Sequence, residues 1–577
     1  MLSVCLRAPL LCLLVVALGA VAGSAQDKSL RWHDAAELPL EGRGWTETKH
    51  RYDRLPAKAE ALVRRPVWDL AQHSAGFSIR FVTNATTISS RWTLRSKRLE
   101  MPHMPATGVS GLDLYVKSDG RWNYLGTGRP AQAEQNESVL VRDLEPIERE
   151  FRVYFPLYNG VEKLEIGIPE AATFKPASPL AAGIKPLVFY GTSITQGGCA
   201  SRPGMAYPAI LGRMLGVPVI NLGFSGNGKT EPEMARLLAE LNAAAYILDS
   251  LPNLETAQVG ERLPPFIDIL RQRHATVPIV LLESIPYPDK PFIGKRNERF
   301  IGSNDTLRRI YNERREKGDK RLYYVPSHSF LGLDGEGTVD GVHPTDLGFQ
   351  RMAESLALHL RLIPGLIPAV SPSESAEEHF TPLFDGQSLN GWERLDSVPM
   401  EHVGGKWKAE GGVLIGDQDP PGRGGFLVTK TTFRDFVLRL EVQQDYPTDT
   451  GIFVRLGEDG KSHQLTLDYR PLGEFGAIFL PWTQSRILRN PEGIKFYKPG
   501  EWNDVIVRVE GEPARLRFWL NGTLITDFQH TPESTKGVPA QGRIGLQVHP
   551  NVPNLTTWKP GNTVRYRNIR INRLDSR

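Results

Sequence analysis

A serine stands where a buried strand is expected to end. The apolar run at 186–190 leads directly into the segment GTSIT, which places Ser193 on the loop that follows the strand. In open α/β sheets, ligands bind and chemistry takes place at the carboxyl ends of the strands. Ser193 is therefore a candidate nucleophile. A strand-to-helix turn built of small residues, with no chemistry, is the alternative interpretation.

A serine hydroxyl becomes a useful nucleophile when a base removes its proton. The segment VDGVHPTDLGF at 339–349 offers His343 as the base and Asp340 as a carboxylate partner. On a turn, this spacing lets the carboxylate bond one ring nitrogen while the other nitrogen faces the serine, as in a Ser-His-Asp triad. An aspartate three residues before a histidine is also common by chance, and Asp340 could instead cap a surface helix.

Acyl transfer further requires donors for the oxyanion that forms on the attacked carbonyl group. The second apolar run ends in the glycine-rich turn GFSGNG at 223–228, which offers the backbone N–H of Gly226. The third run leads into LPN, so the side chain of Asn253 is a second candidate donor. Asparagine is also a frequent turn former. Three successive strand ends that each carry a useful group favour one shared site.

Three patterns of hydrophobicity divide the chain and predict the elements that position these residues. Residues 30–178 hold short alternating runs such as FSIRFVT and KLEIGIP, which predict an antiparallel β-sandwich. Residues 180–365 alternate continuous apolar runs with helical stretches, which is typical of a parallel sheet covered on both faces. After a linker at 366–379, residues 380–577 return to short strands and predict a second β-sandwich.

The ordered segments GTSIT, GFSG, PN and DGVHP resemble the four blocks of the SGNH (GDSL-type) hydrolases. The resemblance implies a flavodoxin-like domain in which Ser193 is the nucleophile, with Asp340 and His343 completing the triad. It also implies that Gly226 and Asn253 are the oxyanion donors. The segment SGLDLYVK at 110–117 is similar to the Gly-x-Asp-Leu-Tyr signature of a β domain that precedes one branch of that family, and residues 197–208 fit the same branch.

Two positions depart from the commoner family pattern. Thr192 stands in place of the aspartate of the Gly-Asp-Ser-Leu block, which removes a local carboxylate but no member of the triad. The usual Gly-x-Asn-Asp block is here DSLPNL, which lacks both the glycine and the aspartate that follows Asn253. The branch with the Gly-x-Asp-Leu-Tyr domain tolerates both changes.

The C-terminal segment resembles the 3-keto-disaccharide hydrolase-like family in PLFDGQSLNGWERL, TGIFVRL and RFWLNGTLITDF. The resemblance implies a concanavalin-like sandwich that either binds sugar or forms a second catalytic domain. It departs from the family where SHQLTLD replaces the usual Glu-x-Gln. Arg455, His463 and Asp468 are the candidate polar residues of its site. Trp482 is the candidate for stacking on a sugar ring, although tryptophans in sandwiches are more often part of the core.

Net charge, the N-terminal segment and cysteine content indicate which classes of protein are excluded and in which compartment the protein is expected. The 577 residues carry 69 Lys and Arg against 65 Asp and Glu, and this net charge of +4 argues against an electrostatic nucleic-acid binder. Residues 1–25 are interpreted as a secretory signal rather than a membrane anchor, so the mature protein is expected to be secreted or periplasmic. Cys199, then the only cysteine, is expected to be a small buried residue. No segment has the spacing of a metal site, and no cofactor is expected.

These observations predict a multidomain protein with an N-terminal β-sandwich, a central α/β domain of SGNH type and a C-terminal concanavalin-like β-sandwich. The predicted activity is that of a secreted serine esterase that deacetylates carbohydrate, with an acylated carbohydrate as its partner and no membrane contact after signal cleavage. One alternative is a bifunctional protein whose C-terminal domain hydrolyses 3-keto-glycosides. Another is a non-catalytic sugar-binding protein with vestigial hydrolase blocks. The sequence leaves the oligomeric state open.

Overall fold

The computed structural model describes residues 29–574, apart from 119, 133, 181–182, 290–291, 328–329, 333, 362, 368–379, 397–403, 484 and 552–555. The expected signal segment at 1–25 and most of the expected linker lie outside the described residues. The chain divides into two compact units: Met1–Ala57, Asp69–Ala182 and Ser201–Gly204 form the first, and Lys58–Trp68, Gly183–Ala200 and Met205–Arg577 form the second. The predicted domain bounds stay predictions.

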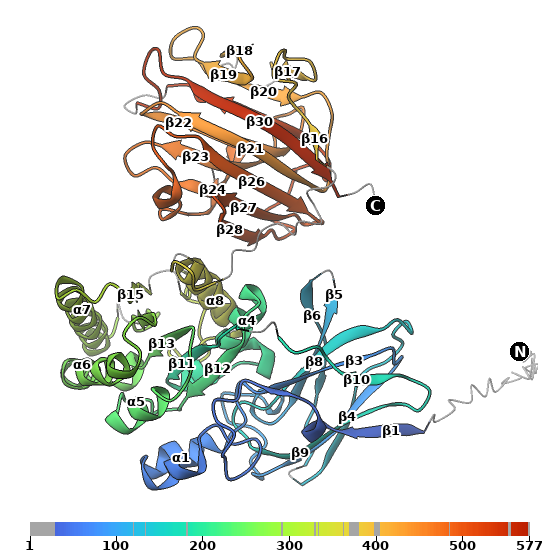
Figure 1. Ribbon diagram of the computed structural model, residues 1–577, viewed down its shortest axis with the longest axis vertical. Coiled ribbons are helices and arrows are strands. Elements are labelled where there is room, and N and C mark those ends of the chain that lie inside the picture. The colour runs from blue at the N-terminus through green and yellow to red at the C-terminus, as the bar shows by residue number, and fades with distance from the viewer. Residues whose placement is uncertain are drawn as a thin grey trace, which may run out of the picture. The chain divides into compact units, whose positions relative to one another are not determined.

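The first unit is a β-sandwich of two antiparallel sheets (Figure 1). One sheet has the order β1-β9-β4-β7, and the other has the order β10-β3-β8-β5-β6 with β2 paired to β3. The inward side chains of these strands form a continuous apolar core that includes Phe81, Trp92 and Phe151. The strands are β1 (Leu30–Asp34), β2 (Leu40–Glu41), β3 (Ser78–Thr83), β4 (Ile88–Leu94), β5 (Leu112–Ser118), β6 (Arg121–Gly128), β7 (Asn136–Val141), β8 (Arg149–Tyr154), β9 (Val161–Pro169) and β10 (Phe174–Pro176).

The Gly-x-Asp-Leu-Tyr segment lies on β5 and anchors the short segment 201–204 of the same unit. The buried carboxylate of Asp113 accepts hydrogen bonds from the Arg202 guanidinium at 2.8 Å and from the Gly204 N–H at 2.9 Å. Arg202 also donates to the Tyr115 hydroxyl at 2.6 Å. Burial raises the pKa of Asp113, and the charge of Arg202 offsets part of that rise. The two motifs that fit one branch of the family are thus held together by one buried ion pair.

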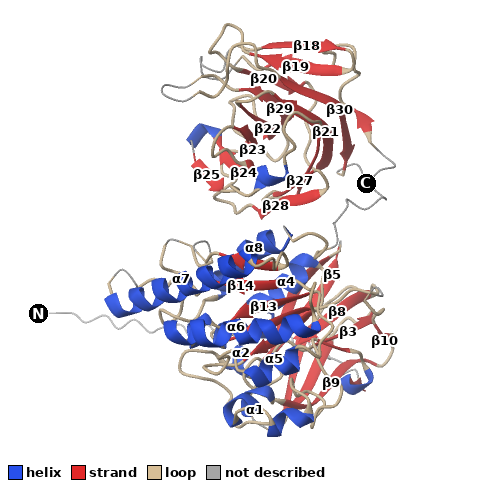
Figure 2. Cartoon of the chain, turned by 60° about the vertical axis from the view of Figure 1, so that its left-hand side comes forward, coloured by secondary structure: helices blue, strands red, loops and turns tan. Residues whose placement is uncertain are grey.

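The second unit begins with a five-stranded parallel sheet whose order is β12-β11-β13-β14-β15. In chain order this is 2-1-3-4-5, the flavodoxin-like arrangement that the sequence predicted. The strands are apolar on both faces because helices cover both of them (Figure 2). The elements are β11 (Leu187–Gly191), α3 (Ser193–Gln196), α4 (Tyr207–Leu215), β12 (Val219–Gly223), α5 (Pro232–Leu238), β13 (Ala245–Asp249), α6 (Thr256–Arg273), β14 (Ile279–Leu282), α7 (Gly294–Glu316), β15 (Leu322–Val325) and α8 (Asp346–Arg361).

Two short helices precede this sheet in the chain, α1 (Arg65–Ala71) and α2 (Ala106–Val109). Among the helices of the described residues, none is long and apolar enough to cross a membrane.

The C-terminal residues form a sandwich of an eight-stranded and a seven-stranded antiparallel sheet with a large apolar core between them. Its hairpins use the expected turn residues: Asn521 and Gly522, between β27 and β28, both have positive φ, of 51° and 79°. The strands are β16 (Thr381–Pro382), β17 (Trp392–Arg394), β18 (Lys406–Glu410), β19 (Val413–Asp417), β20 (Gly425–Thr429), β21 (Phe436–Gln444), β22 (Thr448–Leu456), β23 (His463–Tyr469), β24 (Phe475–Leu480), β25 (Ser485–Leu488), β26 (Asn503–Glu510), β27 (Arg515–Leu520), β28 (Thr523–Gln529), β29 (Arg543–Val548) and β30 (Val564–Arg573). The predicted fold class is confirmed.

Candidate active site

The register of the parallel sheet brings three of the candidate residues to one edge. Gly191, the last residue of β11, pairs with Gly223 at the end of β12 and with Asp249 at the end of β13. Ser193, Gly226 and Asn253 follow β11, β12 and β13, respectively. The chain order of the sheet reverses between β11 and β13. Such a switch point is where open α/β sheets form their ligand-binding crevice.

Ser193, His343 and Asp340 form a continuous chain of hydrogen bonds. Ser193 Oγ lies 2.9 Å from His343 Nε2, and His343 Nδ1 lies 2.7 Å from Asp340 Oδ2. With the proton on Nδ1, the imidazole donates to the carboxylate and Nε2 accepts from the serine hydroxyl. The serine is 8 % exposed and the His343 side chain 21 % exposed, so both groups are largely shielded but open to solvent.

The loop before α8 orients the carboxylate of Asp340 toward His343. Its Oδ1 accepts the backbone N–H groups of Val342 at 3.0 Å and of His343 at 2.8 Å, which leaves Oδ2 for the imidazole. Partial burial works against ionisation, but the hydrogen bonds and the charge of His343 prevail and lower the pKa of Asp340. The carboxylate therefore stays ionised and can stabilise an imidazolium. Burial, with a further contribution from the Asp340 charge, raises the pKa of Cys199 to about 12, so this thiol is a poor nucleophile.

Glycines allow the turns at this edge to pack against each other. A Cβ on Gly228 would lie 1.9 Å from the Gly191 carbonyl oxygen, and a Cβ on Gly223 would lie 2.1 Å from the backbone nitrogen of Gln196. Gln196 also accepts the Ser225 N–H through Oε1 at 3.0 Å. The short helix that carries Ser193 and the turn after β12 are thus held in contact by both backbone packing and a side chain.

Gly226 and Asn253 belong to this same turn region. Gly226 has φ of +67° and an open space where a side chain would be, so the turn exposes its backbone. Asn253 ends the short helix Leu251–Asn253, and its amide lies against the turn at 224–228. The side-chain amide of Asn253 is assigned the orientation in which both its oxygen and its nitrogen find hydrogen-bond partners. In that orientation, Oδ1 accepts from the N–H groups of Asn227 and Gly228, each at 3.2 Å.

Asp249 is a buried acid that was not among the site residues predicted from the sequence. It is 0 % exposed at the end of β13, and its Oδ2 accepts hydrogen bonds from Thr195 at 2.7 Å and from Tyr207 at 2.9 Å. Its Oδ1 has no hydrogen-bond partner among the described residues. Burial raises the pKa of Asp249 to about 7. Since Thr195 is two residues from Ser193 on α3, this carboxyl group helps to fix the helix that carries the serine.

Two candidate residues of the C-terminal sandwich, Arg455 and His463, are neighbours, because the charge of Arg455 contributes to lowering the pKa of His463. Arg455 is 2 % exposed and donates to the Arg434 carbonyl, the Asp435 carboxylate and the Gly511 carbonyl at 2.8–3.1 Å. His463 is fully buried and stacks on His530, with 3.9 Å between the ring centroids, and burial lowers its pKa to about 4. Trp482 is half-buried in the short helix Pro481–Thr483 that follows β24.

Asp468, by contrast, belongs to a charged cluster on the seven-stranded sheet. It lies opposite Asp449 in the register of β22 and β23, and Arg470 bridges the two carboxylates, at 2.6–2.7 Å from Asp468 and 2.8 Å from Asp449. His549 Nε2 lies 3.8 Å from the Asp449 carboxylate. Burial and the neighbouring charge of Asp468 raise the pKa of Asp449. The cluster thus brings two carboxyl groups together on one arginine, and burial disfavours the ionised form of Asp449.

Three protein families match successive parts of the chain. The GDSL-like Lipase/Acylhydrolase family matches residues 184–361, and the GxDLY domain, described as the N-terminus of SGNH-hydrolase-type esterases, matches residues 30–174. A 3-keto-alpha-glucoside-1,2-lyase-like domain matches residues 379–572. No curated protein matches the chain.

Solved structures are similar to parts of the chain. A protein from Bacteroides ovatus described as a GDSL-like lipase is 38 % identical, with 57 % of this chain and 96 % of that chain covered and a TM-score of 0.54. A salicylyl-acyltransferase from a tetracycline biosynthetic pathway is 19 % identical, covering 57 % of this chain and 95 % of its own, with a TM-score of 0.45. A Parabacteroides distasonis protein described as a glycosyl hydrolase is 22 % identical, covering 36 % and 99 %, with a TM-score of 0.26.

The first of these structures is similar over nearly its whole length, and the family matches account for the N-terminal and central domains in order. The chain therefore belongs to the GDSL-like lipase/acylhydrolase family, as a hydrolase of ester bonds with a GxDLY domain before its catalytic domain and a 3-keto-glucoside-lyase-like domain after it.

Proposed function

We propose that this protein is an exported serine esterase that removes acetyl or similar short acyl groups from carbohydrate. The observation that supports the mechanism best is the hydrogen-bonded series from Ser193 through His343 to Asp340 at the switch point of the parallel sheet. Each side chain has the chemical type and the neighbour that nucleophilic acyl transfer requires.

In this proposal, Ser193 Oγ attacks the ester carbonyl carbon while His343 Nε2 takes the hydroxyl proton. The tetrahedral intermediate collapses as the carbon–oxygen bond to the sugar breaks, and His343 returns the proton to the departing sugar oxygen. A water molecule then attacks the acyl-serine with the same imidazole as its base, which releases the carboxylic acid and restores the serine. Asp340 holds the Nδ1–H tautomer and stabilises the imidazolium in both halves.

The oxyanion is proposed to accept hydrogen bonds from the backbone of Ser193, the backbone of Gly226 and the side chain of Asn253. The contacts of Gln196 with the turn after β12 and of Asp249 with α3 support this assignment, because they fix two donor-bearing segments before substrate arrives. Donors that are already in place need no reorganisation as charge develops, and this is the main source of their catalytic effect.

The carbohydrate part of the proposal comes from the C-terminal domain and from the N-terminal segment. The domain matches a 3-keto-alpha-glucoside-1,2-lyase-like family, whose description refers to a sugar. Residues 1–25 have the composition of a secretory signal, and export would place the enzyme, secreted or periplasmic, where extracellular glycans are found. A sugar-directed domain on the same chain raises the concentration of substrate near Ser193.

The proposal is tested by measuring acetate release from a panel of acetylated oligosaccharides, with acetylated alcohols that carry no sugar as the comparison. Higher kcat/KM on at least one sugar ester than on every simple acetate supports a carbohydrate esterase. Activity confined to simple or long-chain esters would contradict the substrate class while leaving ester hydrolysis intact. Ser193→Ala protein serves as the blank for uncatalysed hydrolysis.

A second catalytic activity of the C-terminal domain is supported by the pair of Asp449 and Asp468. Two neighbouring carboxyl groups, one of which has a pKa raised by burial, are a common arrangement for acid–base work. In a 3-keto-glycoside, the carbonyl group makes the C2–H acidic. Loss of that proton to a base, with cleavage of the C1–O bond and protonation of the leaving oxygen by an acid, completes an elimination.

This second activity is tested on the full chain carrying Ser193→Ala, so that ester hydrolysis does not interfere. Cleavage of a 3-keto-disaccharide that is lost in Asp449→Asn but kept in Asp459→Asn, an exposed aspartate paired with Lys461, would support it. No cleavage by the chain that carries Ser193→Ala alone would contradict the second activity.

A further inference from the structure

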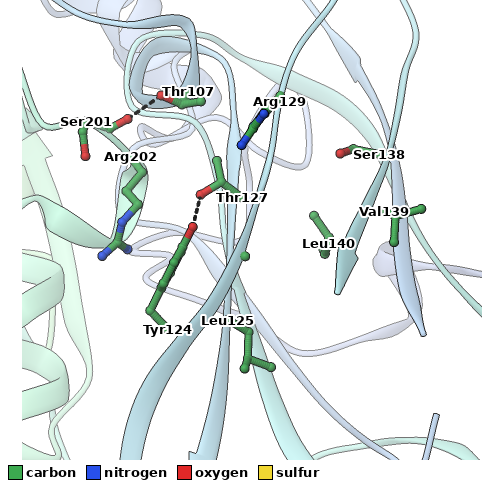
Figure 3. Close-up of a pocket in the computed structure, with 11 residues that line it drawn as sticks. Thr107, Tyr124, Leu125, Thr127, Arg129, Ser138, Val139, Leu140, Ser201 and Arg202 are labelled. Carbon is green, nitrogen blue, oxygen red and sulfur yellow. Dashed lines mark hydrogen bonds between the residues drawn. The ribbon is translucent and has the colours of Figure 1, made fainter. Parts of the chain in front are cut away.

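An open pocket of about 510 Å³ lies at one edge of the N-terminal sandwich (Figure 3). Its main walls are β6 and β7, the edge strands of the two sheets. Its volume falls in the range of about 300–1,000 Å³ that small-molecule sites occupy. The lining residues are Thr107, Tyr124, Leu125, Gly126, Thr127, Arg129, Ser138, Val139, Leu140, Ser201 and Arg202, all of which belong to the first unit.

The walls of this pocket are fixed by close backbone packing. A Cβ on Gly126 would lie 1.9 Å from the Leu140 carbonyl oxygen, so glycine is what allows β6 and β7 to approach each other here. On the opposite side, the Thr107 hydroxyl donates to the Ser201 carbonyl oxygen at 2.6 Å. The backbone therefore fixes these parts of the pocket walls.

The lining contains two cations and no carboxylate, and the two cations differ in their partners. Arg202 is neutralised by Asp113 at 2.8 Å. Arg129 is exposed, and within the described part of the chain it forms neither a hydrogen bond nor an ion pair. Its guanidinium points inward, toward Thr127 (Figure 3). An arginine without a counter-ion in a polar pocket offers a planar, two-pronged site for a carboxylate.

The other side chains suit a sugar ring better than an isolated ion. Tyr124 is 46 % exposed, and its hydroxyl is within 2.9 Å of Thr127. The Arg202 guanidinium covers part of the Tyr124 ring at 4.0 Å, which orients it. The Ser138 hydroxyl has no hydrogen-bond partner among the residues that the structure describes. The pocket thus offers an aromatic surface, hydroxyl groups and one unpaired positive charge.

We propose that this pocket binds an acidic sugar residue of a glycan, a hexuronate, with its carboxylate on Arg129 and its ring and hydroxyl groups against Tyr124 and Ser138. The choice of a sugar rests on the proposed function, and it narrows the substrate class to acylated glycans that carry uronic acid. The positive charge that would attract the carboxylate is that of Arg129, because Arg202 is paired with Asp113.

Binding is tested by titration calorimetry on the full chain with an unacylated hexuronate oligosaccharide, which carries no ester and is not turned over. The controls are the neutral oligosaccharide of the same length and sodium acetate. The acidic oligosaccharide should bind about tenfold more tightly than either control, and its affinity should fall as salt is added. Arg129→Gln should lower that affinity about tenfold or more, because a charge-assisted, bidentate contact is lost.

Arg142→Gln is the matched control, because Arg142 is also an exposed arginine without a described partner but lies outside the pocket. It should leave the affinity unchanged. Equal binding of the acidic and neutral oligosaccharides, equal binding of acetate, or an unaltered affinity in Arg129→Gln would each overturn the proposal. Binding of the acidic sugar without acetate release from any acetylated glycan would support the proposed pocket and contradict the proposed function.

Discussion

Replacing Asp249 with asparagine should remove a large pH dependence from the stability of the parallel sheet. The carboxyl group is 0 % exposed and receives two hydrogen bonds, from Thr195 and Tyr207, on one oxygen. Asparagine keeps an oxygen for these donors but cannot ionise. At low pH, where the buried aspartic acid is neutral, the two side chains are nearly equivalent in shape and in hydrogen bonding. The variants should therefore differ little in stability there.

The magnitude follows from the raised pKa of Asp249, about 7 against an ordinary 3.8. Between these values the unfolded chain is ionised while the folded protein holds the proton. The stabilisation is therefore fully present below about pH 4 and is lost as the pH rises to about 7, with a slope of about 1.4 kcal/mol per pH unit. The whole loss is about 4 kcal/mol, and Asp249→Asn should escape it.

Hydrogen exchange measured by mass spectrometry on peptides from β11 and β13 reports the opening of this sheet separately from the other domains. After correction for the intrinsic exchange rate, Asp249→Asn should gain protection relative to the parent between pH 4 and pH 8. Other titrating groups are common to both proteins and cancel in the difference. Asp268→Asn, at an exposed aspartate paired with Arg314, is the control and should follow the parent. A constant difference between parent and Asp249→Asn across this range would refute the reasoning.

Three further predictions concern the site and the C-terminal domain. Asp340→Asn should keep the fold and lower kcat on a chromogenic acetate by several orders of magnitude, because the imidazole loses its tautomer, whereas Asp334→Asn, which breaks the ion pair with Arg351, should have little effect on kcat. Asn253→Ala should lower kcat about 10²–10³-fold with little change in KM, and a change confined to KM would mean that Asn253 positions substrate instead. Truncation near Glu377 should leave turnover of a small soluble ester unchanged but reduce activity on an acetylated polysaccharide. Trp482→Ala should weaken binding to that polysaccharide. Loss of small-ester activity on truncation would show that the C-terminal domain is part of the esterase fold.

The sequence predicts the strand-end residues well because each follows an uninterrupted apolar run. Ser193, Gly226 and Asn253 could be assigned to one edge without a structure, since parallel strands place their carboxyl ends together. The same rule places Asp249 at this edge, because it ends the apolar run of β13, but the rule does not reveal that its carboxyl group is enclosed. Its partners Thr195 and Tyr207 are 54 and 42 residues away in the sequence, so nothing local indicates the contact.

The C-terminal residues illustrate why strand alternation alone does not define a face. Arg455 has φ of 52° within a register irregularity between Phe453 and Leu456, so counting alternate residues along β22 does not tell which side it takes. Asp449 could not be predicted as a site residue from the sequence, because its contact with Asp468 depends on the register between β22 and β23. Pairing between strands is decided by the whole sheet, and a single strand carries too little information to specify it.

The central claim is that Ser193 is the nucleophile, and covalent labelling tests it most directly. An alkyl fluorophosphonate should react with the parent protein in a one-to-one ratio, and peptide mass spectrometry should place the adduct on Ser193, with hydrolysis of a chromogenic acetate lost in proportion. Ser193→Ala should take up no label and lose nearly all turnover while its thermal unfolding stays that of the parent. Turnover at the parent rate in Ser193→Ala, or an adduct on another residue, would contradict the account.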